Sequence, residues 1–430
     1  MTKNRLNSLI RFEWLFWTSA CLSAVFLSPG TNPILFTSYF LALPLFAALR
    51  YATDRPILPP NKSAIPLIGI LIIVLLSAAI TPDIQFSLRK ISGLINSIGL
   101  FTALLTSAPS QQKIPTWLLL FSGIAIAGAG AVGSDIYARI PILFPFFELF
   151  YLIVPLLPNV QRVINANLIA GALLWTLPVT AGLLVYNRKN GSILTITLAA
   201  LSLSIQGFLL IIMQSRAALL AILLAGCWSA WLQFNRARHL IVTVGLVCIG
   251  IITLLVLPIW PASVQAGLQD SYFNLLVKGD EGERGSDSLD ARVKIWRRAV
   301  EKISEKPVTG HGLNIFRKIA NQPAPILNSA KEIPHAHNWT LQIILELGLI
   351  GLFFYAWLML AACQHLWISW RLKGAKRPII AGYAAALLAF TLFGLLDTIS
   401  PGARPDFIFW VLLAGAFSLG TDQPENLKAN

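Results

Sequence analysis

The chain has 430 residues, of which 56% are hydrophobic and only 12% are charged. A mean hydropathy of +0.69 excludes an ordinary soluble protein, because a chain of this length would need more polar residues to cover its core. The formal net charge of +14 would suit a nucleic-acid-binding protein, but the basic residues lie in short groups between apolar runs, and we expect no nucleic-acid partner.

The apolar runs predict an all-α polytopic membrane protein with about 12 transmembrane helices. Runs of about 17–22 residues suit helices that cross a hydrocarbon layer of about 30 Å. Helices satisfy their backbone polar groups internally, and the runs lack the alternation of barrel strands. The predicted spans are residues 12–29, 34–50, 64–81, 90–108, 115–134, 166–186, 193–213, 217–233, 240–260, 339–362, 378–397 and 405–420.

The basic residues predict the orientation of these spans. They precede the first span and follow the second, sixth, eighth and tenth, so they share one side if the spans alternate. An excess of Lys and Arg marks the cytoplasmic side, which predicts that both termini are cytoplasmic. The residues are Lys3, Arg5, Arg11, Arg50, Arg55, Lys62, Arg188, Lys189, Arg236, Arg238, Arg371, Lys373, Lys376 and Arg377.

The chain divides into three parts. Residues 1–260 hold spans 1–9, with an interfacial extracytoplasmic segment near 135–165, and residues 339–430 hold spans 10–12 and a short cytoplasmic tail. Residues 261–338 form a large, partly helical extracytoplasmic loop between spans 9 and 10. In this loop Val293, Trp296, Val300 and Ile303 recur at helical spacing, which predicts a helix with one packed face.

Several arginines fall on the extracytoplasmic side, against the charge rule. A single arginine near a helix end often reaches the lipid headgroups. A set of planar guanidinium groups at one membrane face instead favours the binding of phosphate, and here suggests a pyrophosphate attached to a lipid. The arginines are Arg89, Arg139, Arg162, Arg216, Arg292, Arg297, Arg298 and Arg404.

A polar stripe opens the tenth span. Asn338, Gln342 and Glu346 are four residues apart and therefore share one helix face. Such a stripe either makes hydrogen bonds between helices or lines a cavity. His337 lies just before it and is our candidate general base, with His335 as a second possibility.

Other chemical motifs are missing from the sequence. It contains no P-loop, dinucleotide-binding fingerprint, nucleophile elbow or zinc-protease motif. The four cysteines, Cys21, Cys227, Cys248 and Cys363, lie in or beside spans, where we expect them to pack as small apolar residues. We therefore expect no metal and no cofactor, and the energy for any reaction must come with the substrate.

Four stretches resemble the bacterial O-antigen ligases, within the group of ligases and polymerases that act on polyprenyl-linked glycans. They are INANLIAGALLWTLPV at 164–179, SRAALLAILLAG at 215–226, DARVKIWRRAVEKISEKPVTGHGLNIF at 290–316 and HNWTLQIILELGLIG at 337–351. The last fits a ligase pattern of His-Asn, nine residues, Gly, two residues and Gly. The first five spans agree with this group only in hydropathy and position.

The resemblance implies a glycosyltransferase of the bacterial inner membrane with a periplasmic active site. Its donor would be O-antigen on undecaprenyl pyrophosphate and its acceptor lipid A–core, with neither metal nor nucleotide required. The resemblance carries catalytic roles to His337, Arg216 and Arg292. From charge placement we add Arg89, Arg139 and Arg162 as substrate-binding residues, and from the polar stripe Asn338 and Gln342.

Three alternatives stay open. An O-antigen polymerase would use the same donor with a second lipid-linked glycan as acceptor, but the His-Asn spacing and the late large loop favour a ligase. A protein O-oligosaccharyltransferase often carries more sequence after its last span than the TDQPENLKAN seen here. A twelve-span transporter usually has internal repeats and polar residues near mid-membrane, whereas this chain concentrates its polarity at one face.

Overall fold

The computed structural model describes residues 3–26, 33–59, 62–107, 111–134, 164–188, 191–233, 244–245, 289–320, 322, 333–372 and 374–419. Within these ranges the regular elements are α-helices, with one isolated bridge between Ser134 and Ile164. The predicted all-α class is confirmed. Most of the ninth span (240–260), of the interfacial segment and of the first part of the large loop lies outside the described residues.

Each predicted span other than the ninth coincides with a described helix. Among the described residues, seven helices are long and apolar enough to cross a membrane, and Ser38–Ala52, Ala64–Ile80 and Asp406–Ser418 are shorter apolar helices. The elements in chain order are α1 (Lys3–Arg11), α2 (Glu13–Phe26), α3 (Pro33–Ala52), α4 (Ala64–Ile80), α5 (Ile84–Thr106), α6 (Ile114–Gly133), α9 (Ala166–Asn187), α10 (Ile193–Ile212), α11 (Arg216–Gln233), α16 (Leu289–Glu305), α17 (Phe316–Ile319), α18 (Trp339–Leu372), α19 (Arg377–Gly394) and α20 (Asp406–Ser418).

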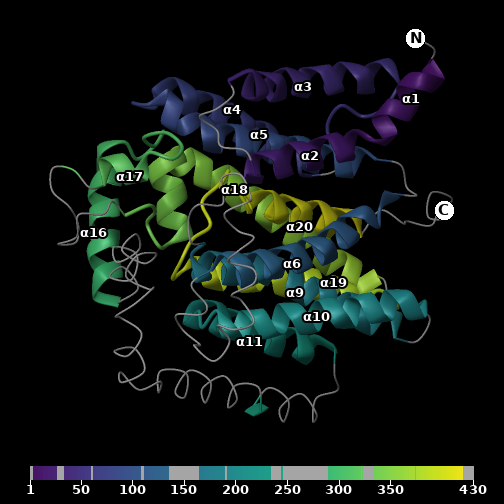
Figure 1. Cartoon of the computed structure of the whole chain (residues 1–430). Coiled ribbons are helices and arrows are strands. Elements are labelled where there is room, and N and C mark those ends of the chain that lie inside the picture. The colour runs from purple at the N-terminus through teal and green to yellow at the C-terminus, as the bar shows by residue number, and fades with distance from the viewer. Residues whose placement is uncertain are drawn as a thin grey trace.

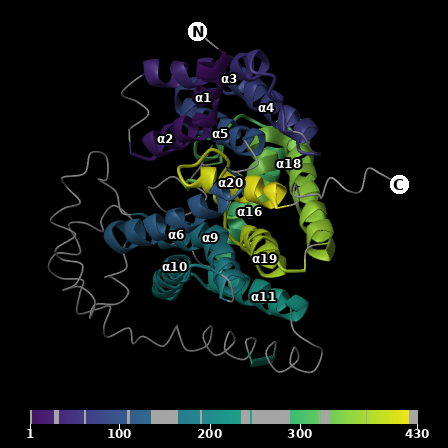
Figure 2. The same ribbon diagram turned by 90° about the vertical axis from the view of Figure 1, so that its right-hand side faces the viewer.

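The apolar helices form one bundle with α20 at its centre. Figure 1 shows them running side by side, and the view along the bundle in Figure 2 places α2 to α5 on one side and α6 and α9 to α11 on the other. Every residue of α20 is buried. Large apolar side chains on the outer helices, such as Leu41, Ile193 and Leu360, are exposed instead. Apolar side chains thus fill the core and also cover the outer surface, which suits a bundle surrounded by lipid.

Helices α9 and α19 make the most extensive contact between two helices in the described part of the chain. A Cβ atom added to Gly182 would meet the carbonyl oxygen of Pro378 at 2.6 Å, and one added to Gly382 would meet that of Pro178 at the same distance. Small residues let helix backbones approach closely where no hydrophobic effect drives the helices together. This contact fixes α19, and with it the segment that connects α19 to α20.

Helix α18 is broken at Gly348, where φ is 72° and ψ is −179°. The segment 307–312, which follows α16, satisfies the backbone groups that the break exposes. Leu349 N–H donates to Pro307 O at 2.9 Å, and His311 N–H donates to Leu345 O at 2.8 Å. An added Cβ at Gly348 would overlap the Val308 carbonyl oxygen. The break therefore locks the chain after α16 onto the helix that begins just after His337.

Helix α16 lies across the end of the bundle (Figure 1). The prediction of its packed face is wrong for two residues, because Val293 and Val300 are 43% and 54% exposed. The buried face consists of Ala291, Ile295 and Ala299, at i, i+4 and i+8. Ile295 and Ala299 pack in a second core cluster with Phe316, Ala320, Ile333, Ala336 and Leu345. The small alanines bring α16 close to the start of α18.

Candidate active site

His337 is held in an unusual backbone conformation at the end of the bundle beside α16. Its φ is 47°, in the left-handed region that few residues other than glycine adopt. The Trp296 indole N–H of α16 donates to the His337 carbonyl at 3.3 Å. Next in the chain, the Asn338 side chain accepts from Leu341 N–H and donates to Leu395 O, both at 3.0 Å. Contacts from three elements thus set the position of His337.

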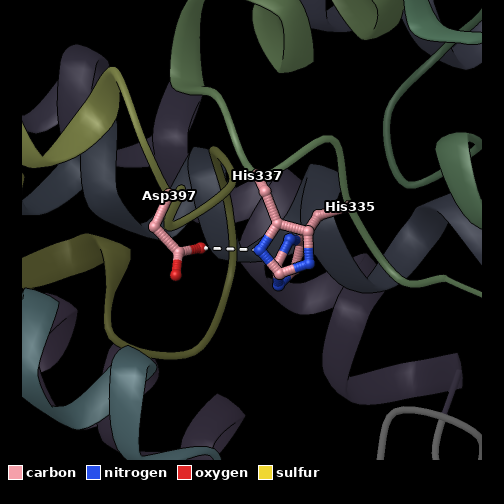
Figure 3. Close-up of side chains that lie close together, drawn as sticks. All are labelled: His335, His337 and Asp397. Carbon is pink, nitrogen blue, oxygen red and sulfur yellow. Dashed lines mark hydrogen bonds and ion pairs between the residues drawn. The ribbon is translucent and has the colours of Figure 1, made fainter. Parts of the chain in front are cut away.

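The His337 side chain pairs with Asp397, which lies in the connection between α19 and α20 (Figure 3). Its Nδ1 is 3.2 Å from Asp397 Oδ1, and both residues are 3% exposed. A carboxylate only accepts hydrogen bonds, so Nδ1 carries the proton. The buried Nε2 has no hydrogen-bond partner among the described residues, and in the neutral ring it keeps its acceptor lone pair.

Asp397 lies beside two imidazole rings and one guanidinium group. Burial opposes its ionisation, yet the pKa of this carboxyl is lower than its ordinary value. The hydrogen bond and charge of His337 are the main opposing cause, with smaller contributions from His335 and Arg292. Arg292 Nη2 lies 3.8 Å from Asp397 Oδ2, and its side chain is 13% exposed. Asp397 is therefore a buried carboxylate that can stabilise a protonated His337.

His335 is next to the pair but is a poor proton acceptor. Its ring centroid lies 4.3 Å from that of His337, at an interplanar angle of 65°. Burial, followed by the charge of His337, lowers the pKa of His335 to about 3. Together His335, His337 and Asp397 offer three potential metal-ligand atoms within 4.8 Å of one another.

The polar stripe of α18 faces the protein interior. Gln342 accepts from Ala336 N–H at 2.7 Å and so supports the segment before His337. Glu346 is fully buried and pairs with Lys90 of α5 at 3.1 Å. The Glu346–Lys90 pair matches the first of the two alternatives for the stripe, hydrogen bonds between helices, whereas the Gln342 bond is local.

The other arginines predicted for the site are exposed or lie outside the described residues. Arg216 is exposed at the first position of α11. A Cβ atom added to Gly130 of α6 would meet Ile169, near the start of α9, and Met213, just before α11. The starts of α9 and α11 therefore lie at the same end of the bundle. Arg89 is exposed on α5. Arg139 and Arg162 lie outside the described residues.

Sequence reasoning missed Asp397 and Lys90. Asp397 ends a predicted apolar span, and Lys90 begins another. A charged residue in or beside an apolar span is costly to bury and is therefore a functional candidate in its own right. That signal was present in FGLLDTIS at 393–400, but no local spacing connects it to His337.

Comparison with known proteins finds a match to a family model. The O-antigen ligase family model matches residues 198–356, and no curated protein matches the chain. The matched stretch contains Arg216, Arg292 and His337, whereas Asp397 lies beyond it. The match agrees with the resemblance seen in the motifs, and it indicates a membrane glycosyltransferase of the O-antigen ligase or polymerase type.

Proposed function

We propose that this protein of the O-antigen ligase or polymerase type acts as the ligase. It transfers O-antigen polysaccharide from undecaprenyl pyrophosphate to lipid A–core at the periplasmic face of the bacterial inner membrane. The observation that carries the proposal is the buried His337, whose Nδ1 is hydrogen-bonded to Asp397 and whose Nε2 has no hydrogen-bond partner among the described residues. Arg292 lies beside Asp397.

The proposed reaction is a single displacement. His337 Nε2 takes the proton of an acceptor sugar hydroxyl, and the hydroxyl oxygen attacks the anomeric carbon of the donor sugar from the face opposite the pyrophosphate. The bond from that carbon to the pyrophosphate oxygen breaks, the leaving group keeps the electron pair, and the anomeric centre inverts. Asp397 stabilises the imidazolium that forms. General-base help of this kind contributes about 10²–10⁴ in rate.

Arg216 and Arg292 are assigned to the leaving undecaprenyl pyrophosphate. Its negative charge grows as the bond breaks, so fixed guanidinium groups stabilise the transition state more than the bound donor. Arg89, Arg139, Arg162, Asn338 and Gln342 stay as proposed substrate-binding residues; the contacts of the last two favour a supporting role for their side chains. Because His337 is buried, this end of the bundle must open to admit the sugars.

The test is transfer by the purified protein. The protein is mixed with lipid-linked O-antigen and lipid A–core, without ATP or added metal, and the products are separated by size. Product on lipid A–core is the expected result, whereas a longer lipid-linked chain would select the polymerase. His337→Ala should fold and bind donor but transfer about 10²–10⁴ times more slowly. Near-normal transfer by this variant would remove His337 from the base role.

A further inference from the structure

His335, His337 and Asp397 form a compact three-residue cluster. Their potential ligand atoms all lie within 4.8 Å of one another, and Figure 3 shows the two imidazoles together on one side of the Asp397 carboxylate. Three buried atoms of the cluster, His335 Nδ1, His337 Nε2 and Asp397 Oδ2, have no hydrogen-bond partner among the described residues. The proposed transfer reaction uses His337 and Asp397 but gives no role to His335.

The donor set determines which cation fits. Two imidazole nitrogens and one carboxylate oxygen are ligands that Zn²⁺ and related transition metals prefer, with water completing the coordination. Mg²⁺ and Ca²⁺ prefer all-oxygen sites. The Arg292 guanidinium, 3.8 Å from Asp397, opposes the binding of a cation. A reversible site is therefore expected instead of a permanently loaded structural one.

We propose that His335, His337 and Asp397 form an inhibitory site for Zn²⁺ or a similar divalent transition metal. A metal held by these side chains occupies the imidazole and the carboxylate that proton removal requires, so the metal and the acceptor hydroxyl compete for one site. The proposed binding of the metal does not depend on the proposed function, whereas the inhibition rests on it.

Metal binding is tested first, with Co²⁺ as a spectroscopic probe and protein purified without a polyhistidine tag. Wild-type protein should bind Co²⁺ with visible absorption bands that Zn²⁺ abolishes and Mg²⁺ leaves unchanged. His335→Gln should weaken binding at least about tenfold, since it removes a direct ligand and even supporting residues contribute about 10–100-fold. Asp397→Asn provides a second variant. His365→Gln changes a histidine elsewhere on α18 and should bind as the wild type does.

The transfer assay then tests inhibition. Zn²⁺ should inhibit wild-type transfer and Mg²⁺ should not, and His335→Gln should need at least about tenfold more Zn²⁺ for half inhibition. Equal Co²⁺ binding by wild type and His335→Gln, or no binding by wild type, would overturn the site while leaving metal-free transfer intact. Cluster-dependent Co²⁺ binding by a protein that transfers no glycan would reject the proposed function alone. Stimulation of transfer by Zn²⁺ would reject inhibition.

Discussion

Asp397 is the residue through which His337 can be tested as part of a pair. Asp397→Asn keeps the size of the side chain but removes the charge that stabilises the imidazolium. We expect transfer to fall by up to the whole general-base contribution, about 10²–10⁴-fold, while donor binding changes little. Turnover and donor affinity are measured separately, and Asp397→Glu should recover part of the lost rate.

A double variant separates a positioning role from a merely structural one. If Asp397 acts through His337, the combined His337→Ala and Asp397→Asn protein should transfer no more slowly than His337→Ala alone, because residues that act as a unit lose their effect together. Two losses that multiply would show that Asp397 acts independently of the imidazole. Thermal unfolding of each variant serves as the control for folding.

Arg216 tests whether the leaving group needs a guanidinium fork or only a positive charge. Removal of one stabilising donor typically costs about 10²–10³-fold in turnover. Arg216→Met should show a loss of this size, and Arg216→Lys a smaller one, because lysine keeps the charge without the planar fork. Arg188→Lys, at the exposed end of α9 and in the predicted cytoplasmic group, is the control and should transfer normally. Full activity of Arg216→Lys would make the fork dispensable.

Local spacing predicted some of the site residues but not how they are paired. The His-Asn pattern at the start of the tenth predicted span drew attention to His337 and Asn338. Asp397 is 60 residues further along the chain, so the contact depends on how α18 and α19 pack together. No periodicity in a single sequence encodes such a pairing. Charge placement suggested Arg89, whereas the buried partner of Glu346 is its neighbour, Lys90.

At the level of elements, Gly348 connects the helix break to the site. Gly348→Ala should destabilise the protein by at least about 1–3 kcal/mol, because φ 72° with ψ −179° is a conformation essentially restricted to glycine. The overlap of the added Cβ with the Val308 carbonyl oxygen increases this cost. Transfer should fall as well, because the segment 307–312, which follows α16, is hydrogen-bonded to α18 around this break. Thermal unfolding and transfer rate are measured together.

Gly207→Ala in α10 is the control for this substitution. An added Cβ there meets no atom within 4 Å, so the variant should be as stable as the wild type or slightly more stable. Equal behaviour of the two variants would mean that the break at Gly348 is not required. Hydropathy predicted the span around Gly348 but not its break, because the composition of an apolar run does not depend on backbone dihedrals.

The packed face of α16 shows a second limit of sequence patterns. Apolar periodicity favoured the larger Val293 and Val300, yet the helix buries Ala291 and Ala299 around Ile295. Close approach to the start of α18 requires small side chains, and alanine contributes little to a hydrophobic pattern. The helix itself was predicted from sequence, but its orientation followed from the space available at the bundle end.

For the whole molecule, hydropathy predicted where the helices lie because each must cross the same apolar layer. The structure adds that the predicted cytoplasmic groups and the candidate site occupy opposite ends of the bundle. Arg188 follows the carboxyl end of α9, and Lys376 and Arg377 begin α19, whereas His337 and Asp397 lie at the amino end of α18 and the carboxyl end of α19. The positive-inside rule then predicts that the end with the candidate site faces away from the cytoplasm.

This orientation predicts which residues a membrane-impermeant maleimide reaches. In a background with the four native cysteines replaced by serine, Glu301→Cys on the exposed face of α16 should be labelled in spheroplasts. Lys376→Cys, at the opposite end, should be labelled only after the membrane is permeabilised. Each variant is first shown to transfer glycan, so that labelling reports a functional protein. Labelling of Lys376→Cys but not Glu301→Cys in sealed spheroplasts would place His337 on the cytoplasmic side, where a periplasmic ligase has no access to its acceptor.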